Sequence, residues 1–218
     1  VSSLNVFGAG AMNLSDDRLS FVENRNDYDN TGQLKSGANR IVSGSPYRGA
    51  FFKSTNGGLN WSELATLPTD TKYLTYMDFL NANTGMVIAD VGSPNTTRSN
   101  IYKTTDGGLT WTIMLIENII GQLESIQYIN ENLVVATGYD FIDSTQKAVF
   151  LKTTNGGMNW SKQVRDSTGY KKVFFINNTT GFIAASTSNN IITQNFIKSF
   201  IYKTTDQGTT WSTIFSKD

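Results

Sequence analysis

Two aspartates in this sequence have the residue type and placement that paired-carboxylate chemistry would need. Asp90 follows the short apolar segment at 86–89, and Asp140 follows a similar segment that begins at 133, so each stands at the end of a predicted second strand. Two facing carboxylates can act as acid and as base or nucleophile in hydrolysis. Acids at the start of a polar loop are also commonly just solvated, and both interpretations stay open here.

A second set of acids belongs to a segment that the chain repeats four times, at 53–61, 103–111, 152–160 and 203–211. The acid is Asp106 and Asp206 in two copies but Asn56 and Asn155 in the others. A turn needs only a side-chain oxygen that accepts backbone N–H groups, which Asn and Asp both supply, whereas a metal ligand or catalytic acid would tolerate the exchange poorly. The repeated line is therefore predicted to be structural. Its key positions are Asn56, Trp61, Asp106, Trp111, Asn155, Trp160, Asp206 and Trp211.

One segment has the beginning of a calcium-binding loop. Asp27, Asp29 and Thr31, followed by Gly32, match the first ligands of such a loop, but position twelve is Ala38, which offers no side-chain oxygen. A polar, turn-rich loop is the favoured interpretation, with calcium as the alternative and no other cofactor expected.

Composition excludes several classes of function. The sequence contains no His and no Cys, so it has no histidine base, thiolate nucleophile, zinc-thiolate site or disulfide. Its formal net charge is +0, which gives no field to attract nucleic acid or an anionic membrane. No apolar stretch approaches the roughly 20 residues that span a bilayer, and the first residues do not form an intact signal peptide.

The spacing of the repeat predicts the architecture. The four tryptophans recur about every 50 residues, a period typical of propellers and solenoids. Each period holds four short strand patterns separated by turns and shows no helical pattern, as in 74–81, 86–90, 101–105 and 110–116. Four-stranded antiparallel units repeated in this way favour an all-β fold, a β-propeller.

At these residues the sequence resembles the Asp-box (BNR) repeat of sialidases and many other propellers. The double-glycine form at 105–111, preceded by the aromatic-lysine pair Tyr102-Lys103, is most similar to a branch with three kinds of member. These are sortilin-like domains, xyloglucanase-type glycoside hydrolases and photosystem II assembly-factor-like proteins. The resemblance covers about residues 49–218 and implies blades of a β-propeller with Asp-box turns.

The chain is predicted to be a single domain, 1–218, of about four blades at 17–66, 72–117, 123–165 and 170–216. Residues 1–16 are expected to be an N-terminal extension or a strand that latches onto a sheet edge. Related propellers commonly have six, seven or ten blades. Four blades would be either a minimal ring or part of a larger propeller.

The resemblance also implies that a ligand would bind at the end of the blades opposite the Asp-box turns. The loops expected there are 43–50, 91–100, 138–148 and 187–199, with the blade-to-blade loops 66–72, 117–123 and 165–171. Aromatic side chains beside charged ones would suit a sugar or an extended peptide. The candidate ligand-binding residues are Tyr47, Arg48, Arg98, Tyr139, Asp140 and Tyr170.

These observations favour a non-enzymatic binding or scaffold propeller that recognises a glycan or a partner protein outside the cell or at its surface. Its oligomeric state stays open. The alternative is a carbohydrate-active hydrolase, or a fragment of one, with Asp90 and Asp140 as its acids. A sialidase is disfavoured, because the Arg-Ile-Pro motif of that family would fall at Arg40-Ile41-Val42, which lacks the proline.

Overall fold

The computed structural model describes residues 6–8, 12–15, 18–21, 51–54, 60, 62–64, 71–91, 98–115, 119, 121–166, 169–187 and 198–217. Within these ranges every element of regular secondary structure is a β-strand. No helix long and apolar enough to cross a bilayer occurs in them.

The first sheet contains five short strands in the order β2-β3-β1-β4-β5. This sheet differs from a simple antiparallel meander at β1. That strand lies between β3, with which it pairs parallel, and β4, with which it pairs antiparallel. The strands are β1 (Val6–Gly8), β2 (Met12–Ser15), β3 (Arg18–Phe21), β4 (Phe52–Ser54) and β5 (Ser62–Glu63).

The second, third and fourth sheets each contain four antiparallel strands in sequence order. The second sheet is β6 (Thr71–Phe79), β7 (Gly85–Val91), β8 (Arg98–Thr104) and β9 (Thr112–Leu115). The third is β10 (Gly121–Tyr128), β11 (Val134–Ile142), β12 (Thr145–Thr153) and β13 (Ser161–Asp166). The fourth is β14 (Gly169–Phe175), β15 (Gly181–Ser186), β16 (Ser199–Thr204) and β17 (Ser212–Lys217). This is the four-stranded repeating unit that the sequence predicts.

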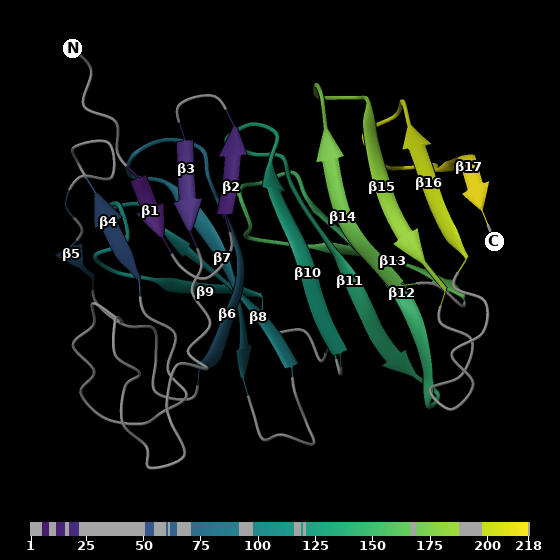
Figure 1. The fold of residues 1–218 in the computed structure, drawn as a ribbon, viewed down its shortest axis with the longest axis horizontal. Helices are drawn as coiled ribbons and strands as arrows, with labels where there is room; N and C mark the ends of the chain where they lie inside the picture. Colours follow the sequence, from purple (N-terminus) through teal and green to yellow (C-terminus); the bar gives the residue numbers. More distant parts are fainter. Residues whose placement is uncertain are drawn as a thin grey trace.

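The four sheets follow one another in space as they do in the chain. In Figure 1 the first sheet lies at one end of the row and the fourth at the other, with β6–β9 and β10–β13 between them. The first strands of neighbouring sheets contact one another, β10 touching both β6 and β14. The sheets are therefore stacked face to face, which explains why the second strands are apolar on both faces.

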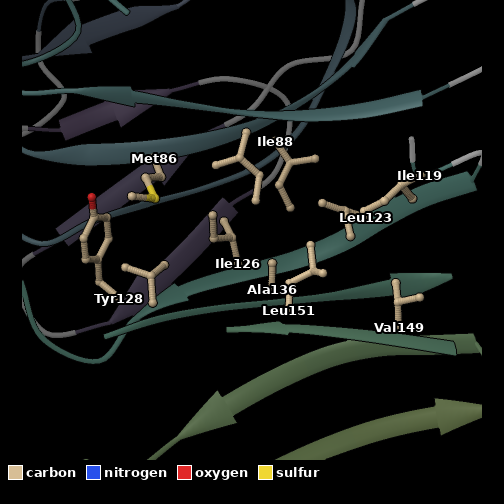
Figure 2. Packing of buried hydrophobic residues seen from close by; sticks show 11 residues of the cluster. Met86, Ile88, Ile119, Leu123, Ile126, Tyr128, Ala136, Val149 and Leu151 are labelled. Atoms are coloured by element: carbon tan, nitrogen blue, oxygen red, sulfur yellow. The ribbon is translucent and has the colours of Figure 1, made fainter. Parts of the chain in front are cut away.

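The largest core cluster lies between the second and third sheets. Met86 and Ile88 of β7 meet Ile126, Ala136 and Leu151 of the third sheet, and all are buried. Figure 2 shows these side chains converging from the two facing sheets. Burial of such a side chain is worth about 1.5–3 kcal/mol, so the stacking of sheets, rather than any one sheet, stabilises the fold.

The repeated turn joins the third and fourth strands of the second, third and fourth sheets. The Asp106 carboxylate accepts a hydrogen bond from the Thr110 amide at 2.9 Å, and Asn155 accepts one from the Asn159 amide at the same distance. Both oxygens also accept the hydroxyl of the Thr two residues earlier, at 2.8 and 2.9 Å. Asn thus performs the same turn-closing role as Asp. Asn56 and Trp61, the corresponding residues of the first copy, lie outside the described residues.

The repeated tryptophans pack toward the preceding sheet. Trp111 stacks on Phe51 of the first sheet, with ring centroids 4.6 Å apart. Trp211 makes an edge contact with Phe150 of the third sheet at 5.2 Å. Trp160 packs against the cluster shared with the second sheet. The tryptophan of the second, third and fourth copies therefore joins two sheets.

The connection between β11 and β12 differs from the sequence-based expectation. The sequence predicts a loop at 138–148, but β11 continues to Ile142 and β12 begins at Thr145. Only Asp143 and Ser144 form the turn, and both have positive φ, 52° and 59°. Positive φ at both central residues matches the right-handed twist of a two-residue hairpin. Tyr139, Asp140 and Phe141 are consequently strand residues.

Candidate functional site

The candidate acids lie at the end of the sheets away from the repeated turns. Gly85 begins β7 opposite Thr104, which leads into the turn, whereas Asp90 pairs with Ser99 near the other end of the strand. Asp140 lies in the same half of β11, paired with Lys147. The register therefore places Asp90 and Asp140 in the half of each strand that is away from the repeated turn.

The two acids do not occupy equivalent positions in β7 and β11. Gly85 and Val134 are equivalent, since they pair with the equivalent residues Thr104 and Thr153. By this alignment the counterpart of Asp90 is Tyr139. Side chains alternate between faces, so the shift of one residue turns Asp140 to the opposite face of its sheet.

Because of this shift, both acids point into the interface between the second and third sheets. Asp90 shares a face of β7 with Met86 and Ile88, while Asp140 shares a face of β11 with Val134 and Ala136. The four apolar residues form one cluster between the second and third sheets. Asp90 and Asp140 thus both belong to the interface between those sheets.

Asp90 is 1% exposed and serves as an acceptor within that interface. The Ser99 hydroxyl donates to one carboxylate oxygen at 2.7 Å, and the Gln122 amide donates to the other at 2.8 Å. Burial raises the pKa of Asp90, and the two hydrogen bonds partly oppose that rise. Ser99 in turn accepts the backbone N–H of Leu123 at 2.9 Å, so the group ties β7 and β8 to β10.

Asp140 is 2% exposed and forms an ion pair with Lys162 of β13 at 2.7 Å. Its second carboxylate oxygen has no hydrogen-bond partner among the described residues. A buried carboxylate held by one cation is stable only as long as that cation stays in place.

The burial of both acids corrects the expectation of exposed carboxylates at loop starts. Neither side chain reaches a surface where a substrate could meet it, and each already accepts hydrogen bonds from its own protein. A general acid or nucleophile must lie within hydrogen-bond reach of the substrate. In this arrangement Asp90 joins the second sheet to the third through Gln122, and Asp140 joins two strands of the third sheet through Lys162.

An exposed aromatic and charged cluster lies close to these acids. Phe141 is 46% exposed and meets Tyr139 edge to face, with centroids 5.8 Å apart. Lys171 of β14 pairs with Glu124 of β10 at 2.6 Å, and its ammonium lies 5.8 Å from the Tyr139 ring. We call Glu124, Tyr139, Phe141 and Lys171 the aromatic-ion cluster. It spans the third and fourth sheets.

The electrostatics of this cluster follow from burial and from Glu124. Burial raises the pKa of Tyr139, and the negative charges of Glu124 and Asp90 raise it further. Burial, then Glu124, likewise raises the pKa of Tyr76 on β6. Both phenols therefore stay protonated at neutral pH and can donate or accept hydrogen bonds. The Tyr139 hydroxyl is 3.3 Å from Gln122, the residue that also binds Asp90.

The first strands converge near this cluster. Lys172 of β14 reaches past β10 to the Tyr76 ring of β6, with its ammonium 5.6 Å from the centroid. Burial lowers the pKa of Lys172, and the charge of Asp78 partly restores it. Side chains from the second, third and fourth sheets thus meet around the inner strands.

The remaining predicted ligand-binding residues differ in their exposure and in whether the structure describes them. Tyr170 is 2% exposed and packs against Tyr202 with centroids 5.8 Å apart, so the expectation that it contacts a ligand is corrected: it is core. Arg98 is exposed at the start of β8. Tyr47 and Arg48, like the calcium candidates Asp27, Asp29 and Thr31, lie outside the described residues. In the part of the chain that the structure describes, no group of three or more potential metal ligands occurs.

Sequence reasoning missed Gln122, Glu124 and Lys171. Gln122 and Lys171 fall in the blade-to-blade segments 117–123 and 165–171, which were expected at the binding end, but no spacing singled them out. Glu124 stands at a β-bulge, between Leu123 and Ser125, that the sequence does not signal. A bulge re-aims the side chain beside it, which explains why alternation alone did not place this acid.

Comparisons with known proteins show the fold. No family model matches the chain, and no curated protein does. Among solved structures, the NanB sialidase of Streptococcus pneumoniae matches at a TM-score of 0.51 and 14% identity over 78% of this chain and 28% of that one. At this identity the match shows a shared fold, and it confirms the predicted β-propeller.

Two further solved structures are similar to this chain. "YCF48 bound to D1 peptide" matches at a TM-score of 0.43 and 21% identity, covering 67% of this chain and 42% of that one. The GH74 enzyme of Niastella koreensis matches at 0.45 and 14% identity, covering 76% and 34%. The chain thus spans less than half the length of each of these structures.

Proposed function

We propose that this chain is a non-enzymatic binding propeller that recognises an extended segment of a partner protein through the aromatic-ion cluster. The observation that carries the proposal is the exposure of Phe141 beside the half-buried Tyr139. An aromatic side chain held in place by a second ring is the kind of rigid apolar anchor that dominates protein interfaces. The adjacent cation and anion, Lys171 and Glu124, offer polar contacts at its rim.

The environment of the acids supports binding over hydrolysis. Asp90 and Asp140 are 1% and 2% exposed, and their oxygens accept from Ser99, Gln122 and Lys162. The glycosidase alternative needs two carboxylates on either side of an accessible bond. Glu124, the acid of the cluster, is itself paired with Lys171 at 2.6 Å.

The proposal is tested by selecting binding peptides from a random extended-peptide display library and measuring their affinity by calorimetry. We expect the Phe141→Ala variant to bind a selected peptide at least about tenfold more weakly. The matched control is Leu109→Ala, which removes an even more exposed apolar side chain (58%) from the opposite, turn-bearing end. Its affinity should equal that of the wild type.

A glycan array and a glycoside-hydrolysis assay on the same protein separate the alternatives. Glycan binding that Phe141→Ala abolishes, with no peptide selected, would replace the protein partner by a sugar. Hydrolysis that the Asp90→Asn and Asp140→Asn variants lose would support the hydrolase and contradict the proposal.

A further inference from the structure

Gln122 connects the buried Asp90 to the aromatic-ion cluster by two hydrogen bonds. Its side-chain Nε2 donates to Asp90 Oδ2 at 2.8 Å, and its Oε1 accepts the hydroxyl of Tyr139, which lies 3.3 Å away. Asp90 belongs to β7 in the second sheet, whereas Gln122 and Tyr139 are paired residues of β10 and β11 in the third. A chain of hydrogen bonds therefore leads from a buried carboxylate to a ring of the cluster.

The direction of these hydrogen bonds is set at the buried end of the chain. The Ser99 oxygen accepts the amide of Leu123 at 2.9 Å, and the Ser99 hydroxyl donates to Asp90 Oδ1 at 2.7 Å. Because an ionised carboxylate only accepts hydrogen bonds, Asp90 Oδ2 also needs a donor, and Nε2 of Gln122 supplies it. The amide oxygen of Gln122 then faces Tyr139, so the Tyr139 hydroxyl must donate to it.

Gln127, on the same strand, shows what a glutamine does when it only joins two sheets. Its Oε1 accepts the amide of Phe175 at 2.7 Å, and its Nε2 donates to the carbonyl of Phe175 at 3.1 Å. Both bonds end on the backbone of one residue of β14, and neither reaches the cluster. Gln122 instead ends on the hydroxyl of the half-buried Tyr139.

This arrangement determines which part of the Tyr139 hydroxyl a ligand can use. A phenol hydroxyl has one hydrogen to donate and an oxygen that accepts. The hydrogen is directed at Gln122, and among the described residues no group donates to the oxygen. A ligand at the cluster therefore meets an acceptor.

We propose that Gln122 is a positioning residue through which Asp90 sets the hydrogen-bond polarity of Tyr139, so that the partner must present a hydrogen-bond donor to the phenol oxygen. The requirement on the partner rests on the proposed function, because it needs a partner that binds at the cluster. Backbone N–H groups of an extended segment supply such donors. A group that only accepts, such as a carboxylate, would meet the oxygen without a hydrogen between them and would be disfavoured at this position.

Asp90→Asn tests the direction of the chain, because it keeps the shape of the side chain and adds a donor. The new side chain keeps its oxygen for the Ser99 hydroxyl and turns its NH₂ group toward Gln122. The Gln122 amide must then flip, so that Oε1 accepts from the new donor and Nε2 donates to Tyr139. We expect the Tyr139 hydroxyl to change from donor to acceptor toward Gln122.

Ultraviolet resonance Raman spectroscopy measures this change without a ligand, since the intensity ratio of the tyrosine Fermi doublet differs between a phenol that donates and one that accepts. Each protein is compared with its own Tyr139→Phe version, because the chain contains nine tyrosines. We expect the donor pattern in the wild type and the acceptor pattern in Asp90→Asn. The control Asp106→Asn makes the same exchange in a repeated turn, where Asn155 shows that an amide is tolerated, and should keep the donor pattern. The same pattern in the wild type and in Asp90→Asn would overturn the inference.

A second pair of variants tests Gln122 itself. Gln122→Met removes the amide but keeps a side chain of similar length, so the donor pattern of Tyr139 should be lost. Gln127→Met makes the same change in the bridge that ends on Phe175 and should keep the pattern. Identical spectra from the two variants would show that Gln122 does not orient the phenol. Circular dichroism checks that every variant folds.

Binding of a library-selected peptide, measured by calorimetry, tests the donor of the partner. Tyr139→Phe removes the acceptor, and Asp90→Asn turns the phenol hydrogen toward the donor of the peptide, so each should weaken binding about threefold to tenfold. The double variant should bind no more weakly than the single variants, since the same hydrogen bond is lost. Unchanged affinity in Asp90→Asn would contradict the donor. A library without any binder would contradict the proposed function instead, and the Raman comparison would still decide the polarity of Tyr139.

Discussion

The ammonium of Lys103 lies 2.8 Å from the backbone carbonyl oxygen of Gly156, in the turn of the next sheet. The same turn contains Asn155, whose side-chain oxygen closes it on the amide of Asn159. One copy of the repeat therefore shapes a turn, and the preceding copy supplies the cation that binds it. This coupling explains why lysine and turn recur together in the sequence.

Removing the cation should weaken the contact between sheets. The Lys103→Met variant keeps the apolar stem but loses a charged, partly buried hydrogen bond, so we expect the free energy of unfolding to fall by about 1–2 kcal/mol. Urea unfolding followed by tryptophan fluorescence measures the change. Lys203→Met is the matched control, because no hydrogen bond of this lysine's ammonium to a turn occurs among the described residues, and its stability should equal that of the wild type. Equal losses in both variants would contradict the role assigned to the turn contact.

Acid should destabilise the turns that contain Asp106 and Asp206 and spare the turn that contains Asn155. Hydrogen bonds from the side chain and amide of Thr110 lower the pKa of Asp106 to about 2, and Thr210 does the same for Asp206. A carboxyl whose pKa is lower in the folded state stabilises the protein above its unfolded pKa, and this contribution disappears as the pH falls through the folded value. The loss is expected between about pH 4 and 2.

Between pH 5 and 2 the melting temperature of the double variant Asp106→Asn, Asp206→Asn should fall less than that of the wild type. Asn155 shows that the turn forms with an amide, so the variant should fold. Differential scanning calorimetry at both pH values gives the comparison. An identical acid-induced drop in both proteins would mean that these carboxylates do not control acid stability.

Replacing Asp90 by Asn should preserve stability, whereas replacing it by Ala should not. Because burial raises its pKa, the ionised form costs stability at pH 7, and Asp90→Asn removes that cost while keeping an oxygen for Ser99 and a polar group for Gln122. We expect Asp90→Asn to melt at the same or a higher temperature at pH 7, with its advantage shrinking toward acid pH. Asp90→Ala should be destabilised by about 1–3 kcal/mol, because it leaves buried donors unpaired. A strongly destabilised Asn variant would show that the charge itself is needed.

The fold was predictable because the same turn and strand residues recur in four copies of the repeat. The turn oxygen of Asp106 and Asn155 and the packing of Trp111 could be predicted from single copies and then checked against the others. The aromatic-ion cluster was only partly predictable. Tyr139 and Asp140 were expected at the correct end, but a two-residue hairpin and a one-residue shift in register decide which face each side chain occupies.

Those two features depend on pairing between strands rather than on local sequence. Asp143 and Ser144 adopt positive φ without a glycine, so the hairpin gives no strong local signal. Tyr170 shows the same limit: an aromatic residue beside an expected loop is as suitable for the core as for a ligand, and only the packing of Tyr202 against it decides. The contacts between sheets therefore had to come from the structure.

Lys162 should be important for stability only while the carboxylate of Asp140 is present. Lys162→Met leaves Asp140, 2% exposed, with a buried charge and no cation, and we expect it to lower the free energy of unfolding by on the order of 3 kcal/mol. The double variant Lys162→Met, Asp140→Leu removes both charges and should recover most of that loss, since an apolar pair of similar volume suits the neighbouring cluster. Urea unfolding of the wild type, both single variants and the double variant gives the coupling energy. Additive losses would contradict the pairing. Recovery would show that Lys162 is needed to compensate the buried charge of Asp140 within the third sheet.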